Sequence, residues 1–172
     1  MKGLYVKGSL SICKGGISPD EVMQLLSHST DILHPEKYDQ ILTITLIVGT
    51  NALSVKSPKT GKPLLNVVKD YEKLIQDLTE TFPNARLGLY NVLPRAYICP
   101  ETRQRIEMFN DILDAHIVPR LHNVYWIRHF YDFLDEFGHM RYDLFGRLGI
   151  HLKPKGKAMM ARVIKNYQNS LN

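Results

Sequence analysis

The sequence predicts one α/β domain in which helices cover both faces of a mainly parallel sheet. Short segments rich in β-branched and aromatic residues alternate with longer segments whose apolar residues recur every three or four positions. One short segment, Ile41–Val48, is almost continuously apolar, as expected for a strand that is buried on both faces. A chain of 172 residues suits a single hydrophobic core, so we expect residues 1–172 to form one domain.

The first elements are predicted from short local signals. Leu10–Cys13 is a candidate short strand. A helix should follow it, because Ser18 is a good cap, Pro19 suits the first helical position and Glu21 lies three residues after the cap. We expect this helix to end near His28, before the central strand.

The rest of the chain continues the alternation of helices and strands. A long helix should begin at Pro63, because apolar residues then recur at steps of three or four until Pro83. The remaining expected elements are a strand at Arg86–Leu93, a helix at Glu101–Val118, a strand at Val124–Ile127, a short helix or ordered loop at Tyr131–Phe137, and a last helix at Lys155–Tyr167.

Composition excludes some classes of protein. Hydrophobic residues make up 44% and charged residues 23% of the chain, and its longest apolar run is far shorter than the roughly 20 residues that span a bilayer. We therefore expect no membrane association. The N-terminus lacks the apolar core of a signal peptide, and Cys13 and Cys99 fit no metal-binding spacing. Reduced thiols and a cytoplasmic location are the expectation.

Positive charge is concentrated at the C-terminal end. The net charge is +5, and residues 139–172 hold seven Lys or Arg but one acidic residue, Asp143. Such an asymmetry suggests a polyanionic partner. A solvated basic helix face explains the same pattern equally well.

Polar residues that follow strands are the candidates for a functional site, because ligands bind at the carboxyl edge of open α/β sheets. Gly16 follows the first candidate strand, Asn51 follows the central strand, and His151 precedes the last helix. Glycine and asparagine amides can donate hydrogen bonds to an oxyanion, and a histidine can act as a general base. Structural roles remain open for both polar residues: Asn51 can cap a turn and His151 can hold its loop.

In this order, Gly16, Asn51 and His151 resemble the second, third and fourth sequence blocks of the SGNH, or GDSL-type, hydrolases. The resemblance covers nearly the whole chain from Leu10 onward. It implies a three-layer α/β/α sandwich of flavodoxin type and an ancestral carboxylic ester hydrolase activity, with no metal and no cofactor. In that family, the glycine and the asparagine form the oxyanion hole, the histidine is the base, and a serine in the first block is the nucleophile.

The chain departs from the family pattern where catalysis resides. Leu148 occupies the position of the aspartate in the family's fourth block. Ala52 occupies the position of the aspartate in the third block. The first strand and the nucleophile block are missing, because the sequence around Ser9 lacks the aspartate and lies too close to Gly15 for a helix and a strand to intervene. Either residues upstream of Met1 hold this block, so that the domain is incomplete at its N-terminus, or it was lost together with catalysis.

These departures are similar to those of the OSK domain, a branch of the family that lacks the triad and binds RNA through basic surface residues. The leading hypothesis is a catalytically degraded domain, a pseudoenzyme, that binds RNA. The residues expected to hold backbone phosphates are Arg95, Arg128, Arg147, Lys153, Lys155 and Lys157.

Two alternatives remain open. One is a serine esterase domain of the kind attached to retrotransposon proteins, present as an incomplete chain, with His151 as base and with Asn51 and Gly16 as oxyanion donors. The other is a structural or dimerising domain with protein partners. In each case the missing first strand leaves Leu10–Cys13 to pair with Ile41–Val48, or leaves that edge open and prone to aggregation.

Overall fold

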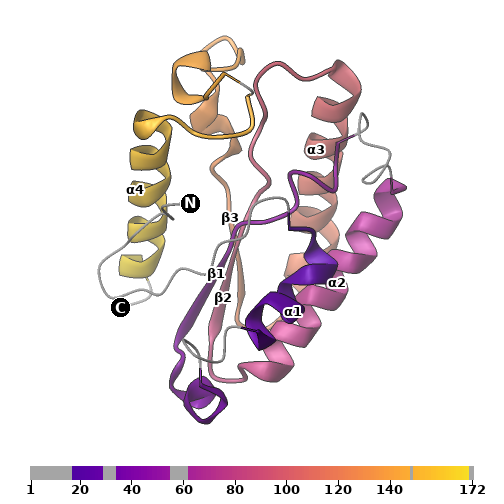
Figure 1. Cartoon of the computed structure of the whole chain (residues 1–172), viewed down its shortest axis with the longest axis vertical. Helices are drawn as coiled ribbons and strands as arrows, with labels where there is room; N and C mark the ends of the chain where they lie inside the picture. The colour runs from indigo at the N-terminus through magenta and orange to yellow at the C-terminus, as the bar shows by residue number, and fades with distance from the viewer. Residues whose placement is uncertain (1–16, 29–33, 55–61, 148, 171–172) are drawn as a thin grey trace.

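A parallel sheet of three strands forms the centre of the molecule. The computed structural model describes residues 17–28, 34–54, 62–147 and 149–170. The strands β1 (Thr43–Leu46), β2 (Arg86–Tyr90) and β3 (Val124–Ile127) lie in the order β1-β2-β3 (Figure 1). Both neighbouring pairs are parallel. Parallel neighbours need crossover connections, and these connections carry helices here.

One face of the sheet is covered by α2 (Leu64–Thr81) and α3 (Pro100–Ile112). Both helices pack because their apolar residues recur at helical spacing and form one buried stripe each. Tyr71 of α2 meets Phe109 of α3 with 5.2 Å between the ring centroids, and both side chains are fully buried. The short helix α1 (Val22–Ser27) lies beside α2 (Figure 1).

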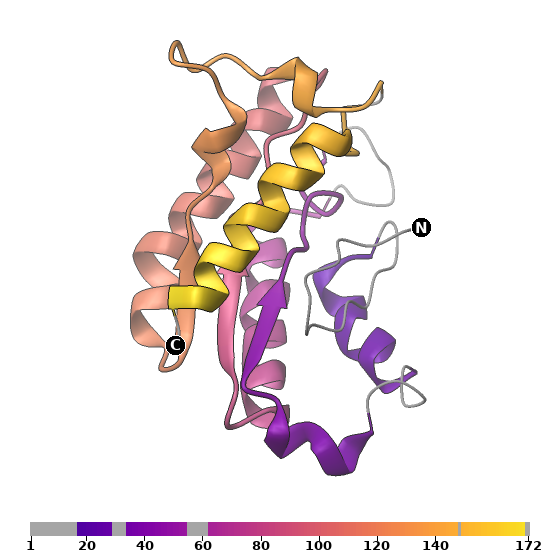
Figure 2. The same cartoon turned by 90° about the vertical axis from the view of Figure 1, so that its left-hand side faces the viewer.

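The opposite face of the sheet is covered by α4 (Pro154–Ser170), which crosses in front of the strands in Figure 2. Met160 and Ile164 of α4 form a second buried cluster with Tyr90 of β2. Close approach depends on Gly88, since a Cβ atom there would lie 2.5 Å from the ring of Tyr167. The three layers confirm the predicted α/β/α architecture.

The burial predicted for the central strand is wrong. Leu46 is buried, but Leu42 and Ile47 are 72% and 46% exposed. The physical reason is position: β1 stands at the end of the described strand order, and the buried contacts of α4 are with β2. The candidate strand Leu10–Cys13, with its expected pairing to this edge, lies outside the described residues.

Several predicted boundaries shift for local reasons. The expected helix at Pro19 begins with a 3-10 turn, Pro19–Glu21, and the predicted capping box is present. The helix expected to reach Val118 ends as an α-helix at Ile112 and continues as π and 3-10 turns to Arg120. The short helix expected near Tyr131 is a 3-10 turn at Phe130–Phe133. No helix among the described residues is long and apolar enough to cross a membrane.

Candidate functional site

Three loops lie beyond the carboxyl ends of the strands, and they carry the predicted site residues. The turn 49–54 follows β1, the segment 91–99 follows β2, and the loop 149–153 leads into α4 (Figure 1). The middle segment touches the other two. A Cβ atom on Gly49 would lie 3.1 Å from Val92, and the Ala96 amide donates to the Gly149 carbonyl at 3.0 Å. Asn51 and His151 therefore belong to the same edge of the sheet.

The turn that carries Asn51 is fixed by its backbone. The Leu53 amide donates to the Gly49 carbonyl at 3.3 Å, and the Ser54 amide donates to the Asn51 carbonyl at 3.2 Å. Gly49 has a φ of +113°, a conformation that favours glycine. The Asn51 side chain is half-buried and makes no hydrogen bond to any other described residue. As far as the described residues go, its amide group is unpaired and could donate to a ligand.

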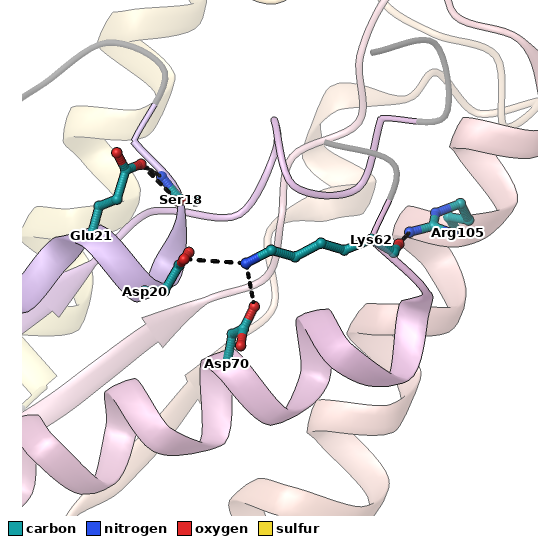
Figure 3. A network of polar contacts seen from close by, with 6 residues as sticks. All are labelled: Ser18, Asp20, Glu21, Lys62, Asp70 and Arg105. Atoms are coloured by element: carbon teal, nitrogen blue, oxygen red, sulfur yellow. Dashed lines mark hydrogen bonds and ion pairs between the residues drawn. The ribbon is translucent and has the colours of Figure 1, made fainter. Parts of the chain in front are cut away.

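A polar network links this turn to α2 and α3, and Figure 3 shows the part of the network around Lys62. Arg105 of α3 donates to the Leu53 carbonyl at 3.2 Å and to the Lys62 carbonyl at 2.7 Å. The Lys62 ammonium in turn pairs with Asp70 of α2 at 2.9 Å and with Asp20 at 3.1 Å. The hydrogen bonds that Lys62 donates to these two carboxylates raise the pKa of Lys62. The sequence pattern did not single out Arg105, because its acceptors lie more than 40 residues away.

His151 is exposed, and no carboxylate among the described residues supplies the partner that a catalytic base requires. Its backbone carbonyl accepts from the Gly146 amide at 2.7 Å, so the loop is held by main-chain contacts. Within the described residues, no carboxylate contacts its ring. Asp143, the nearest acid in the sequence, pairs with Lys155, and this contact lowers the pKa of Asp143. An imidazole without such an acceptor is not held in one tautomer and orientation.

The predicted phosphate-binding residues fall into three groups: unpaired and exposed, paired with a carboxylate, and, for Arg95 alone, half-buried. Arg147, Lys153 and Lys157 are exposed and form no ion pair with another described residue, and they flank the start of α4. Lys155 pairs with Asp143, whereas Arg128 donates two hydrogen bonds to Asp114 at 2.8 and 2.7 Å. The pairing raises the pKa of Arg128.

Arg128 also lies apart from the start of α4. It lines a shallow groove of about 480 Å³ together with Val163 and Tyr167 from the C-terminal half of that helix. Arg95 is half-buried in the segment after β2, where burial lowers its pKa. The Nε and Nη1 atoms of Arg95 have no acceptor among the described residues. Gly16 and Leu148 lie outside the described residues.

Buried polar side chains that the sequence pattern did not single out shape this edge. Asn110 of α3 accepts from the Val92 amide at 2.7 Å and donates to the Val92 carbonyl at 3.0 Å. This pairing explains why β2 ends before the predicted Leu93. Asn110 lies four residues after Ile106, on the apolar stripe of α3. A polar residue on an apolar stripe is the sequence signal that could have identified Asn110 as a buried hydrogen-bonding group.

His129 is the second buried polar group at this edge. Its backbone amide donates to the Asn91 side chain at 3.1 Å, and its Nδ1 atom lies 3.1 Å from the Ile127 carbonyl. The carbonyl can only accept, so Nδ1 carries the proton and Nε2 is the unprotonated nitrogen. Burial lowers the pKa of His129.

The described residues form a three-layer α/β/α sandwich on a parallel sheet, a fold similar to that of SGNH, or GDSL-type, hydrolases. Three solved structures share it with this chain. A GDSL-like lipase from Bacteroides thetaiotaomicron matches at 14% identity over 91% of this chain and 73% of its own, with a TM-score of 0.66. The OSK domain of Drosophila Oskar matches at 18% identity over 72% of this chain and 60% of its own, with a TM-score of 0.57.

The third structure is a protein from Streptococcus pneumoniae, at 19% identity over 73% of this chain and 59% of its own, with a TM-score of 0.62. The chain thus spans about three fifths of the length of the Oskar domain and of the streptococcal protein. No protein-family model and no curated protein matches the sequence. Identities at this level support the fold and leave the activity open.

Proposed function

We propose that this chain is a catalytically degraded SGNH-like domain that binds RNA. The observation that carries the proposal is the surface around His151. Its ring has no carboxylate partner among the described residues, while Arg147, Lys153 and Lys157 stand exposed and unpaired beside it. An edge that lacks an oriented base but keeps free cations suits phosphate binding better than proton transfer. The resemblance to the OSK branch supports the same function.

A charge-removal experiment tests this proposal. The triple variant Arg147→Gln, Lys153→Gln, Lys157→Gln should bind a single-stranded RNA more weakly than the unchanged protein. Each phosphate contact releases counterions from the RNA. Losing three contacts should therefore reduce the steepness of log affinity against log salt by about two units. Fluorescence anisotropy of a labelled RNA, measured from roughly 50 to 200 mM salt, gives both quantities.

A matched triple separates a local site from net charge. The variant Lys69→Gln, Lys73→Gln, Arg120→Gln removes the same charge from exposed positions on α2 and after α3. It should bind RNA almost as the unchanged protein does. Equal weakening by both triples, no affinity at low salt, or an affinity that is indifferent to salt would contradict the proposal.

The competing function is ester hydrolysis at the same edge. It is favoured by the likeness to a GDSL-like lipase and by the unpaired amide of Asn51, which could donate to an oxyanion together with Gly16. It requires His151 to act as base without the carboxylate that normally orients one. Hydrolysis of a short acyl ester that disappears in both His151→Ala and Asn51→Ala would favour this alternative.

A further inference from the structure

Two exposed tyrosines contact each other in the loops at the carboxyl edge of the sheet. Tyr97, in the segment after β2, and Tyr142, at the start of the turn Tyr142–Leu144, have ring centroids 5.1 Å apart and planes inclined at 34°. Their side chains are 68% and 51% exposed. These exposed fractions leave much of each ring open to solvent.

The backbone holds Tyr97 outward. Its φ of +58° lies in the left-handed region, which is disfavoured for residues other than glycine. The preceding residue, Ala96, is buried and bonded to Gly149, where a Cβ atom would lie 1.9 Å from the Ala96 carbonyl oxygen. The chain thus keeps an unfavourable conformation and places a large ring in solvent. Such outliers persist where the surroundings enforce them, and they are frequent at binding sites.

Cationic groups adjoin both rings in the sequence. Arg95 precedes Tyr97 by two residues, and its buried Nε and Nη1 atoms have no acceptor in the described part of the chain. Arg141 directly precedes Tyr142 and donates one hydrogen bond to the Asp132 carbonyl at 3.3 Å. Aromatic rings and guanidinium groups on neighbouring residues of the chain match the two parts of a nucleotide, the base and the phosphate.

We propose that Tyr97 and Tyr142 are a stacking platform for an unpaired base, so that the domain takes single-stranded rather than duplex RNA. This inference rests on the proposed function and deepens it, because the cations alone would not distinguish the two forms. The bases of a duplex are stacked on one another, and their faces cannot reach the tyrosines.

The test compares two double variants on three ligands. Tyr97→Ala, Tyr142→Ala removes the rings, and Tyr97→Phe, Tyr142→Phe keeps them. The ligands are an oligouridine of roughly 12 nucleotides, an abasic ribose-phosphate strand of the same length, and an RNA duplex. The alanine pair should lose roughly 5-fold to 150-fold in affinity for oligouridine, with an unchanged salt slope. The phenylalanine pair should keep its affinity, and the abasic strand and the duplex should bind both variants alike.

The outcomes separate this inference from the proposed function. If oligouridine binding survives the alanine pair but falls in the Arg147, Lys153, Lys157 triple, the platform is overturned and the RNA-binding proposal stands. An equal loss on the abasic strand, or tighter binding of duplex than of single strand, also overturns the platform. Absence of RNA binding by the unchanged protein overturns both. Circular dichroism and a thermal melt establish that each variant is folded before binding is compared.

Discussion

At the scale of single residues, Asn110 replaces a strand partner for the segment that follows β2. Its amide group makes both hydrogen bonds that the Val92 backbone would otherwise make to a neighbouring strand. Asn110→Ala should leave a buried N–H and a buried carbonyl without partners, which costs about 2–4 kcal/mol of unfolding free energy. Chemical denaturation measures the loss.

The exposed position Gln104 on the same helix offers the control, since Gln104→Ala should change stability by less than about 0.5 kcal/mol. A similar small change in Asn110→Ala would show that solvent replaces the lost bonds.

Site residues could be predicted from the sequence only where a residue's place next to a strand or helix fixes its place in the fold. Asn51 was expected at the carboxyl edge because it closely follows a strand, and it lies in the turn 49–54 that follows β1. The bond between Asn110 and Val92 spans 18 residues and depends on how α3 settles against the sheet. The contact between Tyr97 and Tyr142 joins two loops that no periodicity links. Side-chain bonds of this kind follow from tertiary packing, which local patterns do not encode.

At the scale of elements, α4 lies close to the sheet because β2 has a glycine beneath it. Gly88→Ala should destabilise the fold by about 1–3 kcal/mol, since the new methyl group would overlap the buried ring of Tyr167. Tyr167→Leu makes room, so the double variant should be more stable than the sum of the two single losses predicts, by at least about 0.5 kcal/mol. Thermal or denaturant unfolding of the four proteins gives the coupling. Simple additivity would mean that α4 shifts as a whole to absorb the methyl group.

Elements were predicted well where the apolar pattern repeats over many residues and proline marks the ends. The helix expected at Pro63 is α2, which begins at Leu64, and its predicted apolar positions lie in the core. The strand Val124–Ile127 is also confirmed. The burial of β1 was not predictable, because an apolar run shows that a strand can be covered but not how many neighbours it has. Leu42 and Ile47 are exposed for that reason.

At the scale of the whole molecule, the buried His129 should make stability depend on pH. Burial lowers its pKa below the ordinary value of 6.5, so the unfolded chain binds this proton more readily than the folded one. The stabilisation is fully present above pH 6.5 and is lost as the pH falls from there through the folded pKa. Unfolding free energies measured between pH 7.5 and 5 should therefore decline. The decline should be shallower in His129→Phe, and equal slopes in both proteins would show that other groups dominate.

The contact between Gly149 and Ala96 has a consequence for interpreting the motif that contains His151. Any side chain at position 149 would collide with a main-chain oxygen, and the φ of +68° disfavours other residues independently. Steric necessity alone is thus sufficient to retain this glycine through evolution, whether or not the neighbouring imidazole ever moves a proton. In this chain, close packing alone accounts for the glycine of the Gly-x-His sequence, so that sequence is not by itself a sign of enzymatic activity.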